Sequence, residues 1–482
     1  MAHKMSKRGE SMKKILSILV TIIVMIMVVF LTKNNVYGIE TLPQYDETFN
    51  NNNGIFYANG NPITINKDNE GKTIVYWNGG SQVVPNTITI VGGGDSGTSF
   101  EETNIIMEDG TVGNIYGGGK SQIEDKIAKV SNSNIIINGG RVINGIAGGG
   151  LLYSNTENAN IIVNNGTITD VNGGGMASAV ISGVKYSAGS KEKPEESKNR
   201  VENAKIIING GTIDTLPSSF GTVFGGGQGH SYTGNVNVLI NGGNLSKAYV
   251  TAGGSNGYTK KSYIEINGGN INVLQSVNRG KIESANVLIA GGQIQNAYVG
   301  GETEDTSVNG TIDSVNLEAI GGKIIKLNKG TSGGTEINID QEKYNVIYTE
   351  ETVDNFEIDE KEIKITYDFK IVNDEFNLSC GSTKKLDVEI KTNPSGYEEL
   401  LKMKKVDWNS KDNSIAIVDE NGIVEGIKAG NTEITAKWLD KQDSINIKVI
   451  QSKETLLMFV WILMIVLLLL IILVILGVII VF

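Results

Sequence analysis

A short pattern of apolar and polar positions recurs through the middle of the sequence: an apolar triplet, a polar residue and a pair of glycines. Its clearest copies are residues 135–140, 206–211, 238–243 and 264–269, and weaker copies end at Gly110, Gly166, Gly292 and Gly322. Two positions after each second glycine stands a β-branched residue or leucine: Val112, Val142, Ile168, Ile213, Leu245, Ile271, Ile294 and Ile324. Repetition at a period of about 20 to 50 residues indicates a solenoid.

The triplets also predict which side chains face the core. Glu265 and Glu318 occupy the middle of their triplets, so this position faces water. Because strand side chains alternate, the two flanking residues must point inward. The predicted inward pairs are Ile135/Ile137, Ile161/Val163, Ile206/Ile208, Val238/Ile240, Ile264/Ile266 and Val287/Ile289.

Successive copies are 30, 26, 45, 32, 26, 23 and 30 residues apart. Further glycine clusters, at 117–119, 148–150, 173–175 and 225–227, are expected to supply positive φ at sharp corners. Short strands and glycine corners predict a parallel β-helix, right-handed by the general rule for parallel crossovers. Glycine would cost ~1 kcal/mol per residue in an α-solenoid, and the short copies cannot hold the four strands of a propeller blade.

Asparagine recurs just before the glycine pair, at Asn138, Asn165 (shifted by one), Asn209, Asn241 and Asn267. In stacked coils these amides could bond to one another, which resembles the asparagine ladders of known right-handed β-helix proteins. Alternatively, Asn-Gly is simply a good turn sequence. The sequence does not choose between the two.

The spacing of 45 residues marks an insertion between Gly166 and Gly211. Its segment 191–198 is charged and contains a proline. We expect a solvated loop there.

The first apolar segment, Ile15 to Leu31, is an uncharged run of 17 residues. Lysines precede it and a small residue, Gly38, follows shortly after, which is the layout of a secretory signal peptide covering residues 1–38. The same run is also just long enough to span a bilayer if it is not cleaved.

The second apolar segment, residues 456–482, has 27 residues without a charge or a proline. At ~1.5 Å per residue its helix would reach ~40 Å, enough for a hydrocarbon core of about 30 Å. No Leu-Pro-x-Thr-Gly signal precedes it, so we expect a retained transmembrane helix rather than sortase-type attachment. The lysine-rich N-terminus stays inside by the positive-inside rule, which places residues 39–455 outside the cell.

Four short motifs follow one another before this second segment. They are Trp-x-Ser at 408–410, Asp-x-x-Gly at 419–422, Gly-x-x-x-Gly at 426–430 and Thr-x-Ile-Thr-Ala at 432–436. Asn421-Gly422 favours a hairpin turn, and Trp408 is the expected core aromatic. Residues 371–451 closely resemble the group 2 bacterial immunoglobulin-like domain of invasin- and intimin-type adhesins. The resemblance implies a small β-sandwich that spaces or displays other domains and carries no catalytic residues.

Composition limits the chemistry of the chain. Its net charge of −11 argues against nucleic acid as a partner. The single cysteine, Cys380, permits no intrachain disulfide and is expected to be a packing residue. Only His3 and His230 are present, which excludes a histidine-based triad or metal site, and His230 is expected in a loop.

Carboxylates at the corners are the remaining candidates for catalysis, as in β-helix enzymes that cut polysaccharides. They are Asp95, Asp109, Asp170, Asp214, Glu302 and Asp305, and they do not share one column of the repeat. We therefore assign no catalytic, cofactor-binding or metal-binding residue, and we expect no cofactor and no enzymatic activity.

The predicted layout is all-β with a C-terminal transmembrane helix. Its parts are a signal peptide or uncleaved span (1–38), an N-terminal cap (39–86), β-helix repeats (87–334), connecting strands (335–370), an immunoglobulin-like domain (371–451) and a transmembrane helix (456–482). We expect a membrane-anchored bacterial surface protein for adhesion or cell-surface interaction, with a glycan, cell-wall or host ligand. The alternatives are a polysaccharide lyase or glycosidase and a cell-envelope scaffold.

Overall fold

A computed structural model describes residues 41–190, 193–214, 221–302, 310–332, 335–336, 344–349, 352–357, 363–402, 405–451, 457 and 460–472. β-Strands make up nearly all of the regular structure in these residues, so the all-β prediction is confirmed. The predicted signal segment, residues 1–38, lies outside the described residues.

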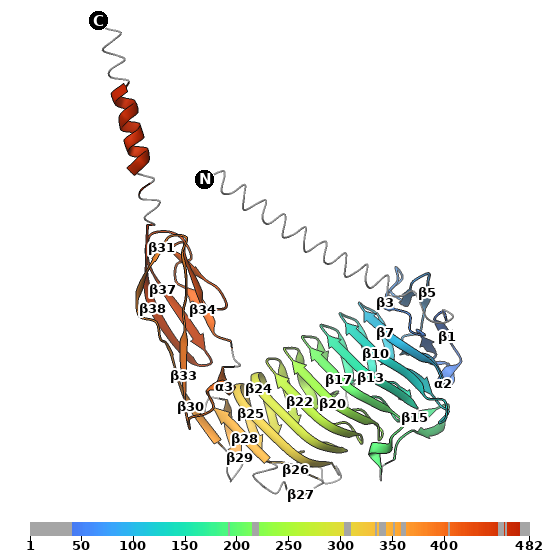
Figure 1. Ribbon diagram of the computed structural model, residues 1–482. Coiled ribbons are helices and arrows are strands. Elements are labelled where there is room, and N and C mark those ends of the chain that lie inside the picture. Colours follow the sequence, from blue (N-terminus) through green and yellow to red (C-terminus); the bar gives the residue numbers. More distant parts are fainter. Residues whose placement is uncertain are drawn as a thin grey trace. The chain divides into compact units, whose positions relative to one another are not determined.

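The longest strands of successive repeats pair with one another in parallel (Figure 1). In order they are β7 (Ser99–Met107), β10 (Ala128–Ile137), β13 (Ser154–Val163), β17 (Arg200–Ile208), β20 (Tyr232–Ile240), β22 (Tyr258–Ile266) and the first parts of β24 (Lys281–Tyr298) and β25 (Thr311–Asn328). Equivalent residues of the repeat stand opposite one another, so that Ile135 pairs with Ile161 and Ile161 with Ile206. The repeat period is therefore the register of this first ladder.

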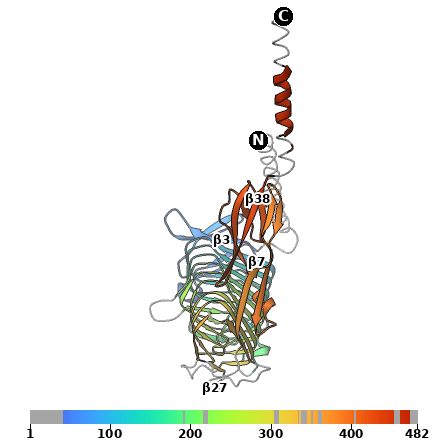
Figure 2. The same cartoon turned by 90° about the vertical axis from the view of Figure 1, so that its left-hand side faces the viewer.

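A second parallel ladder follows the glycine pairs. Its strands are β6 (Thr89–Val91), β8 (Thr111–Tyr116), β11 (Arg141–Ala147), β14 (Thr167–Asn172), β18 (Thr212–Ile213), β19 (Gly221–Phe224), β21 (Asn244–Thr251), β23 (Asn270–Gln275) and the second parts of β24 and β25. A third, short run pairs β9 (Lys120–Ser121) with β12 (Leu151–Leu152) and continues as single bridges through Met176, Gln228 and Ser255. Successive repeats overlie one another (Figure 2), and we call residues 89–328 the parallel stack.

Inward-pointing side chains form a continuous apolar core inside the stack. All twelve residues of the predicted inward pairs are at most 2% exposed, and so are the eight residues that follow the glycine pairs. The middle residues Ile136 and Ile162 are only partly buried, as predicted for the outward face. Leu288 is an exception at 3% exposed, because it packs in a separate cluster with Ala290 and Ile320.

Glycine has two different roles in the stack. The glycine that ends each of the eight motif copies has positive φ, from 78° at Gly322 to 103° at Gly110, a conformation that glycine adopts without steric cost. The predicted positive φ in the clusters at 117–119, 148–150, 173–175 and 225–227 is wrong. There the neighbouring repeat excludes a side chain: a Cβ on Gly150 would lie 2.0 Å from the carbonyl oxygen of Gly119.

Antiparallel strands precede the stack. β1 (Gln44–Asp46), α2 (Phe49–Asn52) and β2 (Ile55–Tyr57) come first, and β2 pairs in parallel with β6. β3 (Ile63–Lys67), β4 (Thr73–Trp77) and β5 (Gly80–Val83) form a meander whose first strand pairs in parallel with β7. The meander thereby covers the edge of the first ladder, where an open strand would invite aggregation.

The predicted insertion carries its own hairpin, β15 (Ser178–Ile181) with β16 (Val184–Ser187), followed by the 3₁₀ turn η1 (Pro194–Glu196). Residues 191–192 of the predicted loop lie outside the described residues, and Lys193 and Glu196 form an exposed ion pair of 2.9 Å. The charged part of the insertion is thus solvent-facing where it is described.

Parallel pairing continues beyond β25. After the short pair β26 (Thr331–Ser332) and β27 (Thr335–Glu336), the strands β28 (Tyr344–Thr349) and β29 (Val353–Glu357) pair with the two parts of β25. β30 (Ile363–Ile371) then pairs in parallel with β28 and antiparallel with β33 (Val388–Asn393). The described strands of segment 335–370, which was predicted as connecting strands, therefore extend both ladders. The predicted domain limits themselves stay predictions.

Two further sheets follow β30. One has the order β31 (Phe376–Ser379), β38 (Lys441–Ile450), β37 (Gly430–Trp438) and β34 (Asp407–Ser410). The other has the order β32 (Thr383–Lys385), β36 (Ile423–Gly426) and β35 (Ala416–Val418), and the short helix α3 (Glu398–Leu401) lies between β33 and β34 in the chain.

The core of these C-terminal sheets is built around Trp438, which is 1% exposed. Its ring stacks on Phe369 at 5.5 Å between centroids and meets Tyr367 edge-on at 5.2 Å. The expectation that Trp408 is the core aromatic is wrong: Trp408 is only partly buried at the side of this core. Cys380 is free and packs, partly buried, against the same core, as expected.

The predicted transmembrane segment, 456–482, is described only at Leu457 and at residues 460–472, which are helical. Within the described part of the chain, no helix is both long enough and apolar enough to cross a membrane. Residues 473–482 lie outside it.

Candidate functional site

The outward side of the first ladder carries a regular surface across four repeats, with Lys205 as its one charged residue. We call it the asparagine face: residues 132, 134, 136 and 138 on the first repeat, 158, 160, 162 and 164 on the second, 203, 205, 207 and 209 on the third, and 235, 237, 239 and 241 on the fourth. Each is partly or fully exposed. Strand alternation produces this surface directly, because the intervening residues point into the core.

One asparagine ladder runs along the edge of the face beside the glycine pairs. Each amide nitrogen donates to the amide oxygen of the preceding repeat: Asn164 to Asn138 at 2.9 Å, Asn209 to Asn164 at 2.8 Å, Asn241 to Asn209 at 2.9 Å and Asn267 to Asn241 at 3.3 Å. Of the two readings of these asparagines, the ladder is therefore confirmed. Its second member is Asn164 rather than the expected Asn165, which occupies the position of the first glycine.

Two further ladders cross the same face, and the repeat pattern did not predict them. Asn158 donates to Asn132, Asn203 to Asn158 and Asn235 to Asn203, each at 3.0 Å. Asn134 donates to Asn104, and Asn160 to Asn134, again at 3.0 Å. The sequence does carry a signal for them: asparagines stand six and four positions before the asparagine of the glycine motif. Asn132 and Asn134 precede Asn138 in this way.

An aliphatic column lies between the ladders. It consists of the middle residues of the triplets, Ile136, Ile162, Ile207 and Leu239, all partly exposed. On one side stands the ladder of Asn138, and on the other stand the two remaining asparagine columns. The face thus combines a strip of apolar side chains with rows of amides that donate and accept hydrogen bonds.

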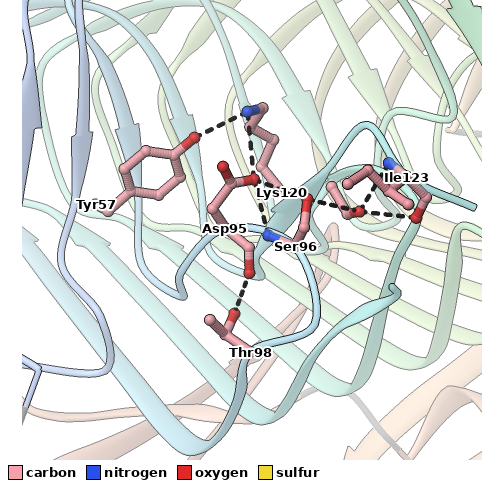
Figure 3. Close-up of polar contacts among 7 residues, drawn as sticks. Tyr57, Asp95, Ser96, Thr98, Lys120 and Ile123 are labelled. Carbon is pink, nitrogen blue, oxygen red and sulfur yellow. Dashed lines mark hydrogen bonds and ion pairs between the residues drawn. The ribbon is translucent and has the colours of Figure 1, made fainter. Parts of the chain in front are cut away.

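A buried lysine is the second feature with chemical potential (Figure 3). Lys120 is 3% exposed, and its Nζ donates to Tyr57 Oη at 2.9 Å and to Asp95 Oδ1 at 3.3 Å. The same ammonium group lies 5.0 Å from the ring centroid of Phe49. Burial, with a smaller contribution from the charge of Asp95, holds the pKa of Tyr57 well above its usual value.

This cluster is reachable from solvent mainly through Asp95, whose side chain is 54% exposed against 4% for Lys120. The Lys120 ammonium donates hydrogen bonds to both the Tyr57 phenol and the Asp95 carboxylate. The Thr98 hydroxyl donates to the backbone oxygen of Asp95 at 2.6 Å. Such a cluster clamps the loop after β6 to β9 and β2. A substrate at this surface would meet only the carboxylate.

The other candidate carboxylates have different surroundings. Asp109 accepts hydrogen bonds from the backbone of Gly110 and from Lys67, and these hold the pKa of Asp109 below its usual value. Asp214 lies 3.4 Å from Lys247, and the backbone nitrogen of Glu302 donates to Gln275. Asp305 lies outside the described residues. No three acidic, histidine or cysteine side chains gather into a metal-binding group in the part that the structure describes.

Asp170 is the candidate whose ionised carboxylate is disfavoured by burial. Burial raises the pKa of Asp170 above its usual value, although Thr222 Oγ1 donates to Asp170 Oδ1 at 2.6 Å. Changing Asp170 to asparagine keeps this acceptor and removes the buried charge. We therefore expect the Asp170→Asn variant to unfold at a higher temperature than the wild type near pH 7.

The sign of this effect fixes its pH dependence. Because the pKa of Asp170 is higher in the folded chain than in the unfolded one, the carboxylate costs stability only above the unfolded pKa of about 3.9. Thermal unfolding of both proteins at about pH 7 and about pH 3.5 measures this cost. The advantage of the variant should disappear at the lower pH, and equal unfolding temperatures near pH 7 would contradict it.

The C-terminal sheets present a groove of about 560 Å³ beside the half-buried Trp408. Lys385, Lys405 and Glu420 are among the residues that line it, and Lys405 lies 3.6 Å from Glu420. Two sheets around one core, with the motifs at 408–436 on their strands and turns, are the architecture that the sequence resemblance implied. Residues 368–449 match the family model of the bacterial Ig-like domain (group 2).

This match confirms the predicted bacterial immunoglobulin-like domain, to within three residues of its predicted limits of 371 and 451. The matched residues begin within β30, at residue 368, and end within β38, at residue 449. A domain of this family indicates a bacterial surface or cell-interaction protein. A comparison of the whole chain with curated proteins found no match.

Proposed function

We propose that the chain is an exported, membrane-anchored bacterial surface protein, and that its parallel stack is a right-handed parallel β-helix displayed by the immunoglobulin-like domain. The in-register parallel ladders and the continuous internal core support the β-helix. The uncharged apolar segments at residues 15–31 and 456–482 support export and a C-terminal membrane anchor. The extracellular part is then residues 39–455.

The observation that carries the proposed role in adhesion is the asparagine face. Its rows of hydrogen-bonding amides and its aliphatic column repeat at the strand spacing of about 4.8 Å. A solenoid offers an extended surface rather than a single pocket, and long binding surfaces are what such folds are used for. The buried Lys120 cluster, in contrast, presents little to a ligand.

A cell-binding experiment tests this role. Bacteria that express the full chain should adhere to immobilised glycans, matrix proteins or other cells. Deleting residues 41–357 should reduce adhesion to that of bacteria without the protein. Protease treatment of intact cells, followed by detection of the shed chain, checks export. Unchanged adhesion after the deletion would overturn the role in adhesion.

Two alternatives have distinct outcomes in the same experiment. A cell-envelope scaffold would bind purified wall from the producing cell and no foreign surface. A polysaccharide lyase or glycosidase would release new chain ends from its substrate, and its activity would depend on acidic residues such as Asp95. Neither outcome is expected of an adhesin.

A further inference from the structure

Charge sets the asparagine face apart from the rest of the chain. Among its sixteen positions, eleven are asparagine, four are aliphatic and one, Lys205, is charged. The chain as a whole has 20% charged residues and a net charge of −11. A surface with one charge among sixteen positions attracts polyanions and basic proteins only weakly, so its best complement is a neutral, hydrogen-bonding molecule.

The ladders leave hydrogen-bonding capacity pointing outward. An asparagine side chain has two N–H donors and an oxygen with two lone pairs. In the ladder of Asn158, Asn203 and Asn235 each amide gives one N–H to the preceding repeat. In these three partly or fully exposed residues a second N–H and a second lone pair remain for a ligand, at intervals of about 4.8 Å along the stack.

The size of the face argues against a second copy of the chain as its occupant. Seven residues along a strand, at ~3.3 Å each, and four strands, at ~4.8 Å each, give about 20 Å by 20 Å. That is about 400 Å², half of the roughly 800 Å² that each partner buries in a standard protein–protein interface. A narrow ligand that runs along the stack uses this area fully.

We propose that the asparagine face binds a neutral, extended polysaccharide along the axis of the stack. The ring faces of its sugars pack on the column of Ile136, Ile162, Ile207 and Leu239, and its hydroxyls bond to the amides on both sides. Each repeat then contacts about one sugar, and affinity accumulates over the four repeats. This inference rests on the proposed function and names the ligand class of the same surface.

Binding of oligosaccharides to the full chain in detergent, measured by isothermal titration calorimetry, tests the proposal. The probes are chitin and cellulose oligomers of two to six sugars, with oligogalacturonate as the anionic comparison. We expect affinity for one neutral series to rise with length up to about four or five sugars, and no comparable affinity for oligogalacturonate. Affinity that is independent of length, or no binding of either neutral series, would overturn the proposal.

Two variants locate the binding. Ile162→Asp puts a charge into the aliphatic column, and Asn209→Ala removes an exposed ladder amide. Each should weaken binding about tenfold or more, a loss of about 1.4 kcal/mol. Val184→Asp, at a 53% exposed residue of the β16 hairpin, is the matched control and should leave affinity unchanged. Unchanged affinity in Asn209→Ala, with its circular dichroism spectrum intact, would overturn the proposed location.

The outcomes also separate this proposal from the proposed function. Adhesion of intact cells without binding of any neutral oligosaccharide overturns the ligand class and leaves the role in adhesion standing. Adhesion that Asn209→Ala leaves unaffected overturns the face as the site. Sedimentation of a dimer that Ile162→Asp abolishes would assign the face to self-association and overturn the polysaccharide.

Discussion

Replacing Trp438 by alanine is expected to lower the free energy of unfolding of the immunoglobulin-like domain by about 3–5 kcal/mol. Trp438 is 1% exposed at the end of β37, so its removal leaves a large cavity. It also removes the stacked contact with Phe369 and the edge contact with Tyr367, worth about 0.5–1.5 kcal/mol each beyond buried area. Urea denaturation followed by circular dichroism measures the loss.

Trp408→Ala is the control for this first prediction. Trp408 belongs to the same domain but is only partly buried at its side, so neighbouring side chains and water can take its place. Its replacement should cost clearly less than that of Trp438. The assignment of Trp438 as the core aromatic would be wrong if the two variants unfolded at the same urea concentration. It would also be wrong if Trp408→Ala unfolded at a lower urea concentration than Trp438→Ala.

Replacing Gly174 by alanine is expected to destabilise the parallel stack by about 1–3 kcal/mol, the usual cost of overpacking. A Cβ on Gly174 would lie 2.4 Å from Thr233 Oγ1, 2.5 Å from the backbone nitrogen of Gly227 and 2.6 Å from its Cα. Two of these atoms belong to the backbone of the next repeat and cannot move without separating the strands. Thermal unfolding of the full chain, followed by circular dichroism, measures the effect.

Gly253 offers a matched control in the same column of the stack. Gly226 holds the position in the next repeat that Gly174 holds in its own, and the backbone N–H of Gly226 donates to the carbonyl oxygen of Gly253. A Cβ on Gly253 would nevertheless have no atom closer than 3.7 Å. Gly253→Ala should therefore leave the unfolding temperature nearly unchanged. Equal losses in the two variants would mean that chain flexibility, rather than close approach of the repeats, explains the glycine clusters.

The glycine clusters show one limit of reasoning from the sequence. Their presence at corners was evident, and glycine at a corner suggests positive φ. Among the glycines of the repeat motif and of these clusters, the glycine that ends each motif copy, such as Gly140, has that conformation, and the cluster glycines do not. At Gly150 and Gly174 the constraint is a carbonyl or an amide of another repeat, and a local pattern carries no information about such distances.

The asparagines show the same division. The column before the glycine pair was found by aligning repeats, but its member in the copy that ends at Gly166 was misplaced at Asn165 because that copy lacks the first glycine. The ladders of Asn132 and Asn134 were not predicted, although their spacing from Asn138 is regular. Pairing with Asn158 and Asn160 becomes visible only when the register between repeats is known.

By itself the sequence determined the all-β class, the repeat, the inward positions of the long strands, most of their outward positions and the family of the C-terminal domain. These follow from side-chain alternation and short local motifs. The tertiary structure decided which side chains and backbone atoms come into contact. Across repeats these are the three ladders, the close approach at Gly174 and the hydrogen bond from Lys120 to Tyr57, which lies 63 residues earlier in the chain. In the immunoglobulin-like domain the tertiary structure placed Trp438, and not Trp408, at the centre of the core. These depend on which strands become neighbours in space. That is set by the packing of the whole chain and not by any segment of it.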